Sequence, residues 1–329
     1  MSSAWQSDKP IVHDKELDIP VLYPALGVSL HLESLTPADQ PALEKANELV
    51  LGWLGPHLRW TYNSAFPVMQ PFRPSDLDYA QGFTRLLDTR LQGLPAEAHA
   101  GAINLRASLV WDFSIDCHGG ELETAGSPFQ YRFFATVGDS PQPEDILPAR
   151  AVVRVLVPCT WPLDDFRARS IELARALPVR WGNAGLAFAG WELSWYREVY
   201  TGVFAHSRRY PGFDVGKYTD LMNELHHAMR TVSWLNFVGP SLSAVLAEKG
   251  QPPAPTDVLS VSREGDLTIV QAGAAPEPGD NNRLEVPRAY VQADAALRPI
   301  RLKPPIDFHG AWDEGTTEAW LTRFERRWE

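Results

Sequence analysis

The segment from residue 151 to residue 195 constrains the fold most strongly. Residues 151–157 (AVVRVLV) form a short apolar run typical of a buried strand. Pro162 suits the start of a helix, whose apolar residues follow at helical spacing until Pro178 ends it. Residues 186–195 (LAFAGWELSW) are predicted to be a second strand, and the small residues 182–185 are predicted to make the turn into it. This order of strand, helix and strand predicts a helix packed across a sheet.

Other segments extend the same alternation of strands and helices. Strands are predicted at 21–33, 104–115 and 129–137, with a hairpin from 258–262 to 267–271. Helices are predicted from Thr36–Pro37 to Gly55–Pro56, from Ser75 onward, and at 217–230, 232–246, 287–297 and 317–329. No break in composition and no internal repeat divides the chain. The sequence therefore predicts an α+β fold with mixed or antiparallel sheets and packed helices: a single compact domain at 21–329 after an N-terminal arm at 1–20.

The formal charge favours a basic partner. The chain has 41 acidic residues against 30 Lys and Arg, which gives a net charge of −11. Such a charge repels phosphate backbones and anionic lipid, so neither nucleic acid nor a membrane is an expected partner. An acidic balance of this kind also serves solubility alone, and charge by itself does not separate these two explanations.

The N-terminal residues, the lack of long apolar stretches and the cysteines indicate the compartment. The N-terminus lacks the basic region and apolar run of a secretion signal, and no stretch approaches 18 apolar residues. Cys117 and Cys159 allow at most one disulfide and have no metal-binding spacing. A cytoplasmic location is therefore expected.

Motifs for enzymatic chemistry are missing from the sequence. There is no nucleophile elbow, no phosphate-binding loop and no zinc-protease helix, so we expect no catalytic residues, no metal and no cofactor. One alternative stays open: Asp112, Asp116 and His118 lie close in sequence, as in a hydrolase that uses carboxylates and a histidine. Cys117 and His118 face opposite sides of a strand, which argues against an activated thiolate.

The chain is rich in tryptophan, with 12 residues. Trp181, Trp191, Trp195 and Trp234 stand in apolar contexts, which favours core packing. The alternative is an exposed aromatic cluster that supplies binding energy to a protein partner.

Several strings of residues resemble a known family. They are 181–186 (WGNAGL), 190–192 (GWE), 209–214 (RYPGFD), 233–239 (SWLNFVG), 269–273 (IVQAG), 278–280 (PGD), 287–290 (PRAY) and 297–301 (LRPIR). In this order they resemble the type VI secretion immunity family, whose members are antidotes to effectors of the virus-type replication-repair nuclease class. The resemblance implies a non-enzymatic protein that binds a toxin encoded nearby. It carries over no catalytic residues.

Most of the shared strings have a structural character. Gly182, Gly185 and Gly190 suit tight backbone positions, and the Pro–Gly pairs at 211–212 and 278–279 suit turns. Asp214 and Asp280 are expected to cap helices or loop amides. Contacts with the toxin are instead expected from carboxylates around the central strand–helix–strand unit, although simple solvation is the alternative. These residues are Glu121, Glu123, Asp139, Glu144, Asp145, Asp164 and Asp165. The oligomeric state stays open.

Overall fold

The computed structural model describes residues 8–16, 18–63, 66–78, 111–137, 149–190, 197–216, 225, 227–303, 308 and 312–325. The strands are β1 (Val12–Asp14), β2 (Ile19–Leu32), β3 (Trp60–Asn63), β4 (Phe66–Pro71), β5 (Trp111–His118), β6 (Gln130–Val137), β7 (Ala149–Pro158), β8 (Val179–Gly190), β9 (Leu235–Val238), β10 (Leu259–Glu264) and β11 (Leu267–Ala272). The helices are α1 (Gln40–Leu54), α4 (Leu163–Ala176), α5 (Arg197–Arg209), α7 (Pro240–Glu248), α8 (Arg288–Leu297) and α9 (Glu314–Leu321).

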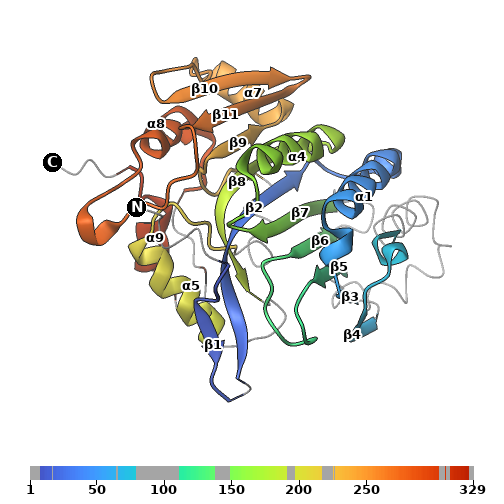
Figure 1. The fold of residues 1–329 in the computed structure, drawn as a ribbon. Coiled ribbons are helices and arrows are strands. Elements are labelled where there is room, and N and C mark those ends of the chain that lie inside the picture. The colour runs from blue at the N-terminus through green and yellow to red at the C-terminus, as the bar shows by residue number, and fades with distance from the viewer. Residues whose placement is uncertain are drawn as a thin grey trace, which may run out of the picture.

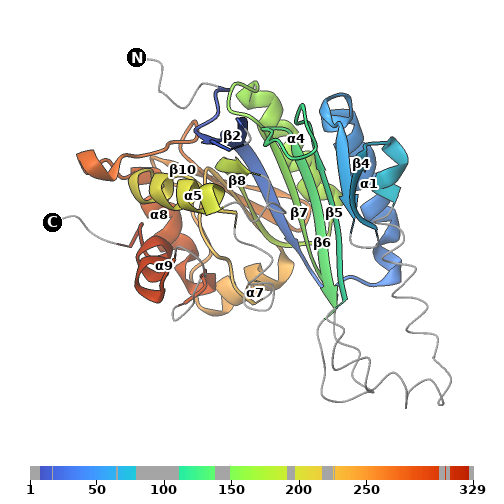
Figure 2. The same ribbon diagram turned by 90° about the horizontal axis from the view of Figure 1, so that it is seen from below.

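One antiparallel sheet organises the described part of the chain. Its eleven strands follow the order β10-β11-β9-β8-β2-β7-β6-β5-β3-β4, with β1 paired to β2. In Figure 1, α1 and α4 lie together over one half of the sheet, and α5, α8 and α9 lie together beside the other half. Figure 2 shows the same division from below. The predicted α+β class and single compact domain are confirmed, and the described sheet is antiparallel.

The central strand β2 sorts its side chains onto two different faces. Leu26, Val28 and Leu30 pair with Val157, Val155 and Val153 of β7, and all six side chains are buried. On this face, Tyr131 Oη donates a hydrogen bond to Asn47 Oδ1 of α1 at 3.3 Å, so the apolar face packs under the helices. The opposite face is mixed: it carries the salt bridge between Arg132 and Asp116 (2.9 Å) and a small apolar cluster that includes Ala25 and Leu156. This alternation follows from the two-residue period of a strand.

The predicted strand–helix–strand unit is confirmed as β7, α4 and β8. Both strands pair antiparallel with β2, one on each side, and α4 connects them. Pro162 precedes the first turn of α4, as expected, and Phe166 is fully buried on its inner face.

The predicted turn at 182–185 is wrong, because these residues lie inside β8. A Cβ on Gly185 would lie 2.3 Å from Ser233 Oγ, and a Cβ on Gly182 would lie 2.6 Å from a methyl group of Leu30. The glycines therefore allow neighbouring segments to approach the strand closely, and they do not reverse the chain.

The predicted helix at 232–246 is also wrong in its first half. Residues Leu235–Val238 form β9, which pairs with β8 and β11, and the helix begins only at Pro240. All four residues of β9 are buried, so both faces of the strand are covered and its apolar run looks like that of a buried helix.

Smaller differences concern the ends of elements. Residues Val12–Asp14, which lie within the expected arm, form β1 and pair antiparallel with Ile19–Leu22 at the start of β2. Just before α1, the Asp39 carboxylate accepts hydrogen bonds from Thr36 N (2.7 Å) and Thr36 Oγ1 (2.9 Å). Residues 74–78 form a short 3₁₀ helix, and the predictions for residues 79–110, 191–196, 217–224 and 326–329 lie outside the described residues.

Candidate partner-binding surface

Four of the predicted partner-binding carboxylates lie within the described residues. Glu121 and Glu123 are exposed in the loop between β5 and β6. Asp164 and Asp165 lie in the first turn of α4, where the helix dipole favours negative charge. Asp139, Glu144 and Asp145 lie outside the described residues. The structure therefore places the four on two segments of the surface.

Asp165 is held in a fixed position by its neighbours. Its carboxylate accepts hydrogen bonds from Trp161 Nε1 (2.7 Å) and from Arg169 Nε (2.8 Å). Partial burial raises the pKa of Asp165, but the bonds from Trp161 and Arg169 outweigh it and leave the pKa below the ordinary value. Asp165 is therefore a fixed charge beside an aromatic ring.

Three aromatic rings connect the two acidic segments. The His57 ring stacks on Phe129 with centroids 4.1 Å apart, and Trp161 meets both rings edge-on, at 5.9 Å and 6.0 Å. All three side chains are half-buried. Sequence reasoning missed this cluster, because its members come from three separate segments and no spacing along the chain marks them.

The loop between β5 and β6 is fixed from both ends. Trp60 Nε1 donates a hydrogen bond to Gly120 O (3.1 Å), and Gly126 N donates one to Pro20 O (2.8 Å). Leu122, between the two glutamates, is 53% exposed. Burial, followed by the charge of Glu121, raises the pKa of Tyr23 on β2. This loop therefore presents its exposed side chains from a rigid base.

Two residues of the alternative hydrolase site, His118 and Asp116, are bound to neighbouring groups within the fold. His118 Nδ1 accepts a hydrogen bond from Gly120 N (3.1 Å), so the proton on Nε2 can be donated to Glu123 O (3.2 Å). Burial lowers the pKa of His118 to about 4. Burial raises the pKa of Asp116, against the effect of its partner Arg132. The side chain of Asp112 lies outside the described residues.

The two cysteines are free thiols and form no disulfide. Cys117 donates a hydrogen bond to Thr61 Oγ1 (3.4 Å), on the side of the strand opposite His118, as expected from alternation. Burial raises the pKa of Cys159 to about 12, so this thiol stays protonated at neutral pH.

Trp181 and Trp234 belong to the core, as their apolar contexts predict. They are 0% and 1% exposed. Trp181 stacks on His31 with centroids 3.9 Å apart and donates a hydrogen bond to Leu225 O (2.6 Å). Trp191 and Trp195 lie outside the described residues.

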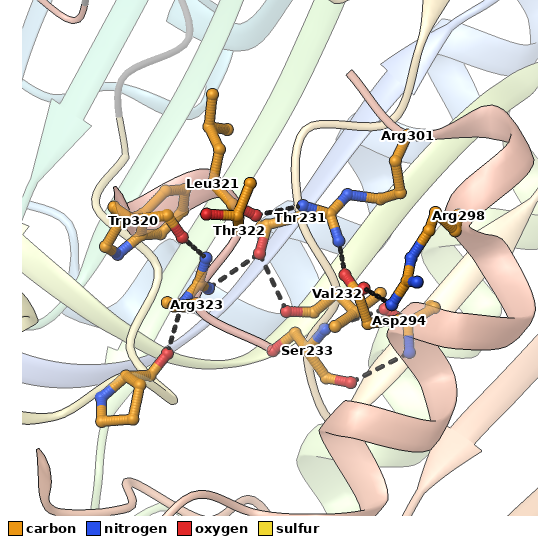
Figure 3. Close-up of polar contacts among 12 residues, drawn as sticks. Thr231, Val232, Ser233, Asp294, Arg298, Arg301, Trp320, Leu321, Thr322 and Arg323 are labelled. Carbon is orange, nitrogen blue, oxygen red and sulfur yellow. Dashed lines mark hydrogen bonds and ion pairs between the residues drawn. The ribbon is translucent and has the colours of Figure 1, made fainter. Parts of the chain in front are cut away.

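Two of the recognised strings, through Pro211 and Arg301, lie beside a buried group of charged side chains. Arg323, 7% exposed, donates hydrogen bonds to Pro211 O, Trp320 O and Thr231 Oγ1 at 2.7–2.8 Å. Its guanidinium carbon lies 3.6 Å from the centroid of the Trp320 ring. Figure 3 shows Arg323 beside Trp320 and Thr231, with Arg301 and Asp294 nearby. Burial and the charge of Arg301 lower the pKa of Arg323 well below its usual range.

The two aspartates of these strings have different structural roles. Asp214 forms a buried ion pair with Arg230 and accepts a hydrogen bond from Gly216 N (3.4 Å). Asp280 caps the short helix at Asn281–Arg283 by accepting from Asn282 N (3.0 Å), and it pairs with Arg209 (3.0 Å). The expected capping of loop amides is confirmed for both residues.

The two predicted Pro–Gly turns contact each other. Gly212 N donates a hydrogen bond to Pro278 O (2.8 Å), and a Cβ on Gly212 would lie 1.9 Å from Glu277 O. Gly279 has a φ of +64°, which favours glycine. The recognised strings therefore build the frame of the C-terminal half, while the carboxylates predicted to bind a partner lie elsewhere.

Two structural findings bear on the class of protein. In the described part of the chain, no helix combines the length and the apolar character needed to cross a bilayer. Among the same residues, no three His, Cys, Asp or Glu side chains gather as metal ligands would.

Comparison with known proteins gives the family. The sequence model of TsiV, described as type VI immunity for VRR-NUC, matches residues 89–324. The chain belongs to this family. As a TsiV member it is a type VI secretion immunity protein, and the resemblance seen in the sequence is confirmed.

One solved structure shares the fold. Pseudomonas aeruginosa T6SS protein PA0821 superposes with a TM-score of 0.68 at 21% sequence identity. The match covers 93% of this chain and 83% of that one. At this identity the likeness concerns the fold alone. No curated protein matches this TsiV member in sequence.

Proposed function

We propose that this TsiV protein protects the cell that makes it by binding a VRR-NUC nuclease effector in the cytoplasm and covering its basic cleft or active site. Membership of the TsiV family is the observation that carries this proposal. The effector is expected to be encoded nearby. Inhibition is stoichiometric, so the protein binds the effector and turns over no substrate.

Charge supports this mode of inhibition. A nuclease cleft holds phosphates and is therefore positively charged. A protein with a net charge of −11 is attracted to such a cleft, because complementary potentials speed encounter and suppress wrong partners.

We further propose that Glu121, Glu123, Asp164 and Asp165 contact the effector. The half-buried rings of His57, Phe129 and Trp161 support this choice, since rigid aromatic groups supply contact area at low entropic cost. Asp139, Glu144 and Asp145 belong to the same proposed surface on sequence grounds alone.

Co-expression of the chain with the effector tests the function. We expect the effector alone to stop growth, and the pair to restore growth and to co-purify. A toxic effector that is neither neutralised nor bound by this chain would refute the proposal.

Charge reversal tests the proposed contacts. The triple change Glu121→Lys, Glu123→Lys and Asp164→Lys should weaken binding by at least about tenfold, because each lysine faces a basic partner. The matched control is Glu248→Lys, Glu285→Lys and Glu318→Lys, which alters three exposed carboxylates elsewhere by the same charge. Equal loss in both triple variants would show that net charge alone governs binding.

A further inference from the structure

An open pocket of about 530 Å³ lies between the β10–β11 hairpin and the start of α8. Its lining includes Thr256, Leu259, Gln271, Gly273, Glu277 and Arg288. These residues come from three segments: the loop entering β10, the end of β11 with the loop that follows, and the first turn of α8. None of the four described carboxylates predicted to bind a partner lines this pocket, although α4 reaches its edge, where Arg167 Nε donates a hydrogen bond to Gln271 Oε1 (2.9 Å).

One wall is fixed by buried aromatic side chains. Gly273 O accepts hydrogen bonds from Trp234 Nε1 (3.2 Å) and from Gln271 Nε2 (3.0 Å). Glu277 N donates a hydrogen bond to Tyr290 Oη (3.2 Å), and the Tyr290 side chain is fully buried. Gly273 has a φ of +81°, so the chain turns here in a conformation that other residues resist.

The facing wall is fixed in a similar way. Thr256 Oγ1 accepts hydrogen bonds from Val258 N (3.2 Å) and Leu259 N (3.1 Å), and it donates one to Gln292 Oε1 (2.6 Å). Pro253 and Pro255 stiffen the loop before it. Both walls are already ordered in the free protein. The entropy cost of ordering them when a ligand binds is therefore small.

The chemistry of the pocket favours a cation with an aliphatic stem. Leu259 and Ala289 are buried and give the pocket an apolar base. Two exposed carboxylates, Asp257 and Glu277, lie at its opening with one cation, Arg288. Arg288 is paired with Asp257 at 2.8 Å. Among the described residues, no cation pairs with Glu277, so its charge remains available.

We propose that this pocket receives an arginine or lysine side chain from a loop of the effector. The methylene groups of such a side chain pack on the apolar base while its charged end reaches the Glu277 carboxylate. This inference rests on the proposed function, and it adds a docking site that the charge of the whole protein does not specify.

Binding of a catalytically inactive effector to purified variants tests the pocket. Glu277→Lys reverses the available charge, and Ser260→Trp fills the pocket from an exposed position on β10 without changing charge. We expect each change to weaken binding by about tenfold or more. Glu318→Lys on α9 is the matched charge control, because this exposed carboxylate lies outside both proposed surfaces, and it should bind within about twofold of the unaltered protein. Melting temperatures of all three variants check that each is folded.

The possible outcomes separate the two proposals. If the unaltered protein binds the effector and both pocket variants bind it as tightly as the unaltered protein does, the pocket proposal is wrong and the proposed function stands. If Glu318→Lys weakens binding as much as Glu277→Lys, net charge explains the effect and the pocket does not. If the unaltered protein does not bind the effector at all, both proposals fail.

Discussion

Asp214 and Arg230 form a deeply buried ion pair, with side chains 7% and 0% exposed. Asp214→Asn keeps the shape but removes the charge, and leaves the guanidinium buried without this counter-ion. We expect a loss of about 3 kcal/mol or more in the free energy of unfolding, measured by urea titration.

Asp280→Asn is the control for this prediction. Asp280 pairs with Arg209, whose side chain is 45% exposed, so water can solvate the guanidinium when the pair is broken. The loss of stability should therefore be clearly smaller. Equal losses in the two variants would show that burial does not set the cost.

His118 makes stability depend on pH. Its pKa is about 4 in the folded protein against an ordinary value of 6.5, because burial disfavours the charged ring. Between these values the unfolded chain binds a proton that the folded protein does not, so stability falls as pH drops from about 6.5 to about 4.

Replacing His118 removes this dependence. From pH 7 to pH 5, we expect the unaltered protein to lose about 2 kcal/mol more of its unfolding free energy than His118→Gln. Urea titration of both proteins at the two pH values measures the difference. Parallel losses in the two proteins would contradict the assigned pKa.

At the scale of elements, the glycines of β8 are required for close packing. A Cβ on Gly185 would lie 2.3 Å from Ser233 Oγ and 3.2 Å from Trp234 N, so Gly185→Ala should cost about 1–3 kcal/mol of unfolding free energy. Gly52 in α1 is the matched control, because a Cβ there meets no heavy atom within 4 Å. Gly52→Ala should instead stabilise the helix by about 0.5–1 kcal/mol. Thermal unfolding of both variants tests the contrast.

Elements with a clear period were predictable from the sequence. Strands β2, β6 and β7, helix α4, the β10–β11 hairpin and helix α8 were all predicted near their observed positions. The short run of β9 was not, since a strand buried on both faces has no period that separates it from a helix. The glycines of β8 were misread because contact with Ser233, distant in sequence, decides their role.

The candidate surface was predictable only in part. Exposed carboxylates can be listed from the sequence, but the ring cluster of His57, Phe129 and Trp161 is created by the pairing of distant segments. The pocket beside α8 has the same origin, because its walls come from three separate segments. Binding surfaces of this kind are properties of the tertiary structure.

The charge of the whole molecule predicts how fast it meets its effector. With a net charge of −11, association with a basic protein is steered electrostatically and is screened by salt. Raising sodium chloride from about 50 mM to about 500 mM should lower the association rate by about tenfold or more and change dissociation much less. Surface plasmon resonance measures both rates. An association rate independent of salt would rule out steering.

The position of β2 has a consequence for synthesis of the chain. This strand emerges early from the ribosome, yet its ladder partners, β7 and β8, belong to residues 149–190. The centre of the sheet therefore stays open until Gly190, the last residue of β8, has been translated, and until then the unpaired edges of β2 can pair with other nascent chains.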